Sequence, residues 1–167
     1  MSKKTGESEH QLGGCICGAI RYQLLGAPLF THACHCTDCQ KLTGSAFGIT
    51  CVFDELDFEL LQGEPEVLRT TGGSGAAKTL FRCGNCGASL YNTTGVRPGT
   101  IVVRPGSLDD STWVNPQAHI YVRSKQSWVE LPAHVPSFDI HYEVSELWPG
   151  ESLRRLEAIR QRNIHHD

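Results

Sequence analysis

Alternating apolar and polar residues recur along the chain and predict short β-strands. In residues 19–25, Ile20, Tyr22 and Leu24 fall on one face of an extended segment. Turn-forming residues recur roughly every ten positions, so none of the strands is expected to be long. The pattern predicts an all-β fold of several small antiparallel sheets. Further runs of this kind occupy residues 45–53, 56–61, 78–82, 100–104 and 118–124. A turn is expected at 53–55, between the first two of them.

A helical pattern replaces the alternation near the C-terminus. Leu153, Leu156 and Ile159 recur at helical spacing, with glutamate and arginine between them. Glu151 or Ser152 could begin the helix. We expect a short surface helix packed on a sheet edge.

Length and composition fit one globular domain, with 167 residues of which 40% are hydrophobic and 20% charged. We expect a polar tail at residues 1–12, a β domain at 13–148, and the helix with its own tail at 149–167. The run His165–His166 is too short to be treated as a metal site. The segment 72–79 nearly matches a phosphate-binding loop, but a strand follows it where such a loop needs a helix. We expect a flexible hairpin loop there, which could border an active site.

Charge and hydropathy exclude two classes of partner. The formal net charge is −3, so no basic surface is indicated for nucleic acid or anionic lipid. No stretch approaches the ~20 apolar residues of a membrane span. The first 14 residues contain two lysines but no apolar segment, so no secretory signal is expected. These features predict a cytoplasmic protein that binds neither nucleic acid nor membrane.

The eight cysteines are the strongest chemical signal in the chain. Cysteine this dense in a reducing compartment is more often metal-binding or catalytic than part of a disulfide framework. Residues two apart in an extended strand project to one side, and a C-x-x-C turn flanked by Gly84 and Gly87 directs two sulfurs at one ion. Cys51 stands alone in an apolar strand and is expected to be a buried, inert thiol. The seven grouped cysteines are Cys15 and Cys17; Cys34, Cys36 and Cys39; and Cys83 and Cys86.

Seven grouped thiols can make one complete tetrahedral zinc site and one site with three protein ligands. We assign Cys15, Cys17, Cys83 and Cys86 to a closed structural site that joins two distant hairpins. Such a site can contribute on the order of 10–16 kcal/mol of apparent binding free energy, which is comparable to the stability of a whole domain.

Cys34, Cys36 and Cys39 then form a second site, and three protein ligands with an exchangeable fourth position are typical of catalytic zinc. Alternatives stay open at this point. His35 or Asp38 could supply the fourth ligand, although His35 lies between two ligands and is expected to point away. His32 or His119 could also close the site. The three thiols could instead be a redox sensor with a Cys36–Cys39 disulfide.

Four blocks of sequence together resemble the glutathione-dependent formaldehyde-activating enzyme family, which shares its domain with centromere protein V. They are GGCICGAIRY, CHCTDCQKLTGSAFG, FRCGNCGASLY and PQAHIYVRSKQSWVEL, and they span most of the chain. The resemblance implies coiled β-sheets around zinc. It also implies two Zn²⁺ per chain, with four cysteines at a structural ion and three at a catalytic ion.

The resemblance further implies a carbon–sulfur lyase of the S-(hydroxymethyl)glutathione synthase type. The expected partners are a small thiol such as glutathione and an aldehyde such as formaldehyde, with formation or cleavage of their adduct. Arg104, Arg123 and Lys125 are candidates for binding the carboxylates of the thiol, and His119 could relay a proton. Short exposed strand edges also make a homodimer reasonable. The alternative function is a non-catalytic, zinc-stabilised module that binds a protein partner.

Overall fold

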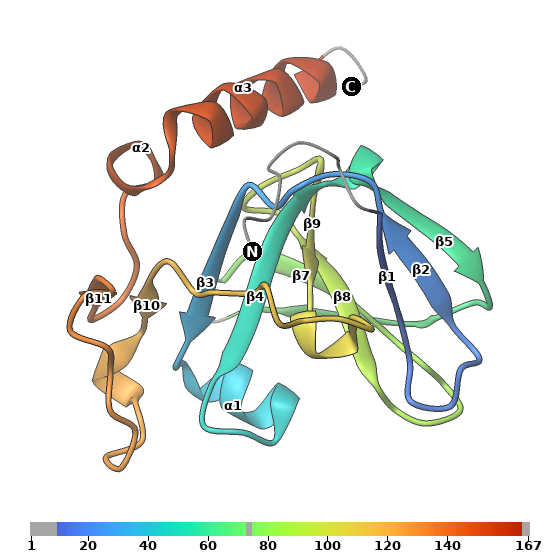
Figure 1. Ribbon diagram of the computed structural model, residues 1–167, viewed down its shortest axis with the longest axis horizontal. Helices are drawn as coiled ribbons and strands as arrows, with labels where there is room; N and C mark the ends of the chain where they lie inside the picture. The colour runs from blue at the N-terminus through green and yellow to red at the C-terminus, as the bar shows by residue number, and fades with distance from the viewer. Residues whose placement is uncertain (1–9, 73–74, 165–167) are drawn as a thin grey trace, which may run out of the picture.

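The computed structural model describes residues 10–72 and 75–164 of the chain (Figure 1). The polar tail predicted at residues 1–12 lies mostly outside this range, as do His165 and His166. The architecture is mostly β-sheet, with a C-terminal helix, which confirms the coarse prediction from the alternation. The smaller of two sheets has three antiparallel strands in the order β1 (Gln11–Gly14), β2 (Arg21–Leu24) and β5 (Phe58–Gln62).

The larger sheet has eight strands. Most neighbours pair antiparallel, but β10 pairs in parallel with both β3 and β11. Parallel pairing is possible here because a long connection separates β3 from β10 along the chain. In spatial order the strands are β11 (Ser137–Phe138), β10 (His119–Ile120), β3 (Phe30–Cys34), β4 (Gly48–Asp54), β9 (Thr100–Val103), β8 (Ser89–Thr94), β7 (Ala77–Arg82) and β6 (Glu66–Thr71).

Short helices join the strands. No helix among the described residues is long and apolar enough to cross a membrane. The helix predicted near the C-terminus is present as α3 (Gly150–Ile164), and it begins one residue before Glu151 and two before Ser152, the two expected starts. The other helical segments are α1 (Thr37–Thr43), α2 (Val144–Leu147) and the 3₁₀ turns η1 (Glu55–Asp57), η2 (Pro105–Ser107) and η3 (Val122–Ser124).

Alternation in β4 and β9 builds two hydrophobic cores, one on each face of the larger sheet. Phe53 and Val103 pack into the core that the smaller sheet covers. Val52 and Val102, one residue away in each strand, pack into the core that the C-terminal segment covers. Successive side chains of a strand point to opposite faces, so one strand can supply both cores. The larger sheet is therefore buried on both sides at its centre.

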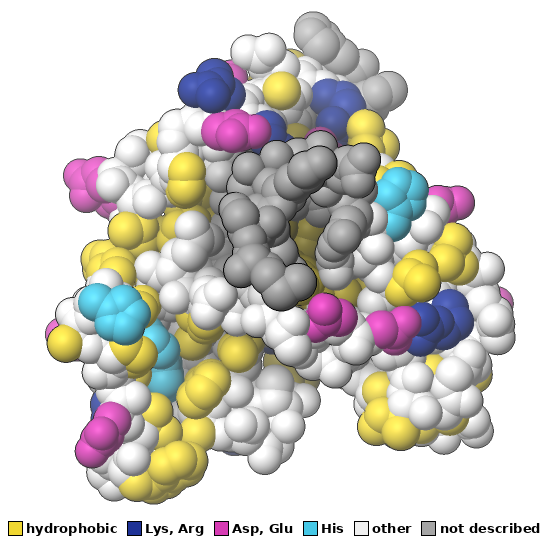
Figure 2. Space-filling view, viewed as in Figure 1, with side chains coloured by type: hydrophobic (Ala, Val, Ile, Leu, Met, Phe, Trp, Pro, Cys, Tyr) yellow, Lys and Arg dark blue, Asp and Glu magenta, His cyan; other side chains and the backbone are white. Residues whose placement is uncertain are grey.

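Ion pairs and a close glycine contact hold α3 on the second core. Arg162 pairs with Asp54 at 2.6 Å, and Arg155 pairs with Asp57 at 3.0 Å. Gly99 lies so close to Ile159 that a Cβ on Gly99 would come within 2.8 Å of the isoleucine side chain. Figure 2 shows charged side chains of both signs beside one another at the top of the view, where Figure 1 places α3.

Two parts of the predicted fold are wrong. The prediction of several small, wholly antiparallel sheets missed the eight-stranded sheet and the parallel pairing of β10. The strand expected at 118–124 ends after Ile120, because Tyr121 has a left-handed backbone with φ of 56° and η3 follows it. A left-handed residue cannot continue a strand. The helix α1, which the alternation did not reveal, is described with the site below.

Candidate metal centres and the adjoining cleft

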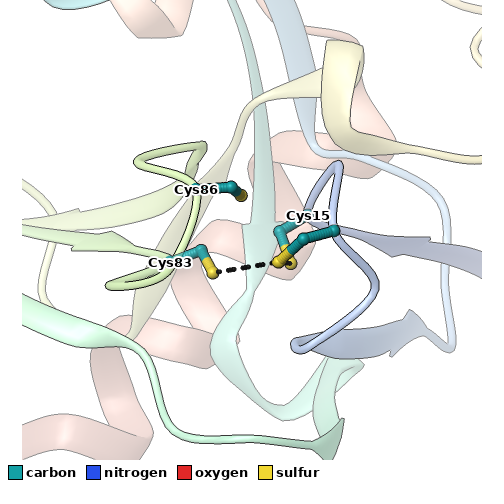
Figure 3. A group of neighbouring side chains, drawn as sticks. Cys15, Cys83 and Cys86 are labelled. Atoms are coloured by element: carbon teal, nitrogen blue, oxygen red, sulfur yellow. Dashed lines mark hydrogen bonds between the residues drawn. The ribbon is translucent and has the colours of Figure 1, made fainter.

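Four of the cysteines meet between two turns that are far apart in the sequence. Cys15 and Cys17 follow β1, and Cys83 and Cys86 lie in the turn between β7 and β8 (Figure 3). Their sulfur atoms all lie within 4.8 Å of one another. The Cys15–Cys17 sulfur distance is 3.4 Å and the Cys17–Cys83 distance is 3.7 Å. This cluster links the smaller sheet to the larger one.

Tight turns aim these sulfurs at a common point. The Gly87 amide donates to the Cys83 carbonyl at 2.8 Å, and Gly87 has a positive φ of 73° that favours glycine. The φ of Gly84, the other glycine of this turn, is not positive. A Cβ there would come within 2.8 Å of a carboxylate oxygen of Glu66, an exposed and flexible side chain that can move aside, so the turn requires glycine at Gly87 rather than at Gly84. Cys15 and Cys17 also lie in a turn rather than in the extended strand that was expected.

The four-cysteine cluster fits a tetrahedral zinc ion. Zinc–sulfur bonds of about 2.3 Å place tetrahedral sulfurs roughly 3.8 Å apart, while a disulfide needs about 2.05 Å. Burial opposes ionisation of Cys15, but hydrogen bonds from the Ile20 amide and from Cys17 outweigh it and lower the pKa of Cys15. Hydrogen bonds from the Ala19 amide and the Asn85 side chain lower the pKa of Cys17. The thiolate form, which zinc binds, is therefore favoured at Cys15 and Cys17. Hydrogen bonds from the Cys86 and Asn85 amides lower the pKa of Cys83, but burial and the contacts with Cys15 and Cys86 outweigh them and raise it to about 11.

Three further cysteines meet at the junction of β3 and α1. Cys34 ends the strand, Cys36 is the N-cap of the helix, and Cys39 lies in its first turn. The Cys39 amide donates to the Cys36 sulfur at 3.3 Å, as in an ordinary N-cap. Gly44 ends the helix with φ of 61°. The change from strand to helix brings the three sulfurs within 4.8 Å of one another.

No histidine, aspartate or glutamate in residues 10–72 and 75–164 completes this three-cysteine cluster at the same spacing. His35 points away, as expected, and its Nε2 lies 3.0 Å from Nδ1 of His119. Both rings are buried. His32 instead contacts the Tyr142 hydroxyl at 3.0 Å through Nδ1. The histidines considered as fourth ligands thus have other partners.

A buried cation lies beside the three-cysteine cluster. Arg104 is 6% exposed, and its Nη1 has no hydrogen-bond partner among the described residues. A Cβ on Gly48 would lie 3.2 Å from that Nη1 and 3.4 Å from the Cys39 Cβ, so both groups flank Gly48. The pKa of Cys39 is raised overall. The hydrogen bond with Cys34 lowers it, but the hydrogen bond with Cys36 and burial together raise it by more. The positive charge of Arg104 counters part of this rise. Arg104 is placed to offset negative charge on the sulfurs.

The three cysteines open onto a cavity of about 170 Å³. Asn92 forms part of the wall, is 3% exposed, and has an Oδ1 atom without a partner among the described residues. Lys78 and Arg97 supply cationic side chains to the same wall. Gly72, Ala76 and Lys78, from the described parts of the loop at 72–79, also line it.

A larger cleft of about 780 Å³ continues from this cavity. Thr94, Arg97 and Tyr121 line both spaces and so mark their junction. Among the described residues, Tyr121 is the one non-glycine with a positive φ. Strained backbone of this kind is concentrated at functional sites.

The structure places the predicted carboxylate-binding cations away from this cavity. Arg123 is exposed on η3, and the Lys125 ammonium donates to the carbonyls of Gln126 and Val129. Arg104 borders a separate cavity of about 590 Å³. Lys78, Asn92 and Arg97 were missed because they come from β7, β8 and the turn after β8, respectively, and no local motif marks them.

Comparison with known proteins identifies the domain. Residues 10–124 match the family model described as glutathione-dependent formaldehyde-activating enzyme. The chain belongs to this family. Membership implies an enzyme-like role in chemistry that involves glutathione and formaldehyde. A crystal structure of a Rhodobacter sphaeroides protein is similar, with 21% sequence identity over 63% of this chain and 91% of that chain and a TM-score of 0.47. Residues 125–164, including α3, lie outside the part that matches the formaldehyde-activating enzyme family.

Proposed function

We propose that the protein is a zinc-dependent carbon–sulfur lyase that forms or cleaves the adduct of a small thiol with an aldehyde such as formaldehyde. The main observation behind this proposal is the three-cysteine cluster at the cavity. Among the described residues, no histidine, aspartate, glutamate or further cysteine supplies a fourth ligand to it. The same chain also contains a complete four-cysteine cluster, so the two clusters differ by one protein ligand. Structural zinc sites have four protein ligands, whereas catalytic zinc sites keep one position for substrate.

Cys34, Cys36 and Cys39 would hold the catalytic ion, and Cys15, Cys17, Cys83 and Cys86 a structural ion. A zinc ion at the first site supplies a Lewis acid that lowers the pKa of a coordinating thiol from about 8.5. Hydrogen bonds with Cys36 and Cys39 raise the pKa of Cys34, and hydrogen bonds with Cys34 and Cys39 lower that of Cys36. A thiolate at Cys36 is also stabilised by the Cys39 amide, which donates to the Cys36 sulfur at 3.3 Å at the start of α1.

The reaction joins the sulfur of the thiol to the carbonyl carbon of the aldehyde. The π-electron pair of the carbonyl moves to its oxygen, which takes up the proton that the thiol has lost, and cleavage reverses these steps. Asn92 offers a buried acceptor for the hydroxyl that forms, and Arg104 offsets negative charge on the cysteines. The narrow cavity holds the two reactants together, which is the main source of rate for an addition that needs little activation.

Metal analysis combined with single cysteine variants tests this function. We expect two zinc ions per chain in the purified protein. Cys36→Ser should reduce the content to one and lower the rate of adduct formation or cleavage at least about a hundredfold. Cys51→Ala is the matched control, because Cys51 is buried away from both clusters and should leave zinc content and rate unchanged.

Cobalt substitution separates this proposal from a non-catalytic, zinc-stabilised interaction module. In a catalytic site the visible spectrum of Co²⁺ at the three-cysteine cluster should change when glutathione is added. An unchanged spectrum, together with no turnover of thiol and aldehyde, would favour the interaction module.

A further inference from the structure

The cleft beyond the small cavity has a wall that the family domain does not supply. Four of its lining residues, Thr94, Val96, Arg97 and Tyr121, lie within residues 10–124, and the others lie in the segment 141–160. Tyr142 from that segment is fixed by hydrogen bonds with His32 and Trp148 at 3.0 and 3.1 Å. The added wall is therefore held firmly against the sheet.

The two spaces differ in the size of the ligand that they can hold. Sites for drug-sized ligands usually measure about 300–1,000 Å³. The cavity of about 170 Å³ at the cysteines falls below this range, and the cleft of about 780 Å³ falls within it. A ligand larger than the reacting groups can extend past the shared residues into the cleft.

Arg97 stands at that junction without a partner of opposite charge. No carboxylate of the described residues forms an ion pair with it, and its side chain instead lies over Trp148 at 5.4 Å from the ring centroid. Burial lowers the pKa of Arg97, and the nearby Arg160 adds to this effect. A half-buried guanidinium without a carboxylate partner favours the binding of an anionic ligand group.

The turn after β8 fixes the position of Arg97. Its amide donates to the Thr94 carbonyl at 3.2 Å, and its own carbonyl accepts from the Thr100 hydroxyl at 2.7 Å. Tyr121, with its left-handed backbone, lies across the junction. The anchor is thus presented by rigid elements, which keeps the cost of ordering it on binding low.

The charges around the two spaces are balanced rather than uniformly positive. Glu157 is already engaged with Arg160 at 3.8 Å. Glu143 is exposed and lines the same cleft as Arg97. A ligand with both an ammonium and a carboxylate matches this lining better than a simple anion. The charged residues are Lys78, Arg97 and Arg160, and Asp38, Glu143 and Glu157.

We propose that the cleft between the turn after β8 and the segment 141–160 binds the body of a peptide thiol that carries free ammonium and carboxylate groups, and that Arg97 binds the carboxylate. This inference rests on the proposed function for the thiol end of the ligand. The chain beyond the family domain then decides which thiols are accepted, while the cysteines act on any thiol that reaches them.

The test compares Arg97→Met, Arg97→Lys and Arg154→Met with the wild type. Methionine keeps an unbranched stem over Trp148 without the charge, and lysine keeps the charge. Arg154 is an exposed arginine of α3 that does not line the cleft, so its variant is the matched control. For Arg97→Met we expect KM for glutathione to rise roughly ten- to hundredfold, and KM for glutathione diethyl ester to change less than threefold. The KM of Arg97→Lys for glutathione should lie between the values of the wild type and Arg97→Met. The KM of Arg154→Met should match that of the wild type.

A second measurement does not depend on catalysis. S-methylglutathione has no free thiol, so its binding by calorimetry reports the cleft alone. We expect wild type and Arg154→Met to bind it equally, and Arg97→Met to bind it at least tenfold more weakly. Absence of binding to the wild type, or equal effects of Arg97→Met on glutathione and its diester, would overturn the inference. Arg97-dependent binding without any turnover would instead overturn the proposed function and leave the inference standing.

Discussion

The side chain of Asn92 combines almost complete burial with an oxygen that lacks a partner in the described protein. A buried polar atom left without a hydrogen bond typically costs about 1–3 kcal/mol. Asn92 lines the cavity at the three cysteines, so a ligand that donates to its Oδ1 would recover this energy. Asn92 therefore lowers the stability of the free protein and favours ligand binding.

Replacing Asn92 by leucine tests this assignment. The variant should be at least as stable as the wild type, because it removes an unsatisfied polar atom while keeping the same branched side-chain skeleton. Its rate with thiol and aldehyde should fall roughly tenfold, since the adduct loses one hydrogen bond. Thermal unfolding, zinc content and turnover measured on the same sample check this. Full turnover in Asn92→Leu would contradict the role.

Arg104 carries a prediction about the metal rather than the substrate. Arg104→Met should make a chelating dye remove zinc from the three-cysteine cluster roughly ten times faster, because a positive charge beside the thiolates is lost. The four-cysteine cluster serves as the internal control, and its zinc should leave at the wild-type rate. Equal acceleration at both clusters would indicate a general loss of structure instead.

These residues show the limit of reading the sequence. The grouping of the cysteines follows from short spacings, because C-x-C and C-x-x-C place sulfurs near one another within a single turn. The structure indeed brings together the same four and the same three residues. Asn92, Arg97 and Arg104 become neighbours of the cysteines through sheet pairing across long separations, and no local pattern predicts that pairing.

At the scale of elements, α1 shows why a motif can be found while its structure is missed. Its seven residues are too few for a clear helical period. The N-cap is a cysteine, which is not among the residues that usually signal a helix start. The spacing of Cys36 and Cys39 nevertheless corresponds to one turn of helix, so the C-x-x-C pattern contained the information in another form.

The attachment of α3 makes a prediction about pH. Burial raises the pKa of Asp54, but the hydrogen bond from Arg162 and the Leu56 amide outweigh it, so the pKa is lowered below 3.8. A carboxyl group with a lowered pKa stabilises the fold above its unfolded pKa, and this stability is lost as the pH falls through the folded value. Asp54→Asn should therefore cost about 0.5–1 kcal/mol at pH 7. The difference from wild type should disappear in the region below pH 3.8.

Denaturant unfolding of Asp54→Asn, Arg162→Gln and the double variant measures the pair directly. The double variant should cost less than the sum of the single variants at pH 7. Strict additivity at that pH would show that the two side chains contribute independently.

At the scale of the molecule, the two clusters have different structural consequences. The four-cysteine cluster joins turns 66 residues apart at its Cys17–Cys83 contact and links the two sheets. The three-cysteine cluster lies within six positions of sequence, at the end of one strand and the start of one helix. Closing a long loop removes more entropy from the unfolded chain than closing a short one. An ion at the first cluster should therefore contribute more to folding.

Stepwise removal of metal follows from this difference. As chelator is added, we expect the first zinc to leave from the three-cysteine cluster, with loss of turnover but little change in far-ultraviolet circular dichroism. Loss of the second zinc should coincide with unfolding, because the ion's binding free energy is part of the folding free energy. Metal content, turnover and circular dichroism followed on one titration series give the order of events. If both ions left together before any loss of structure, the four-cysteine cluster would not be the link that stabilises the two sheets.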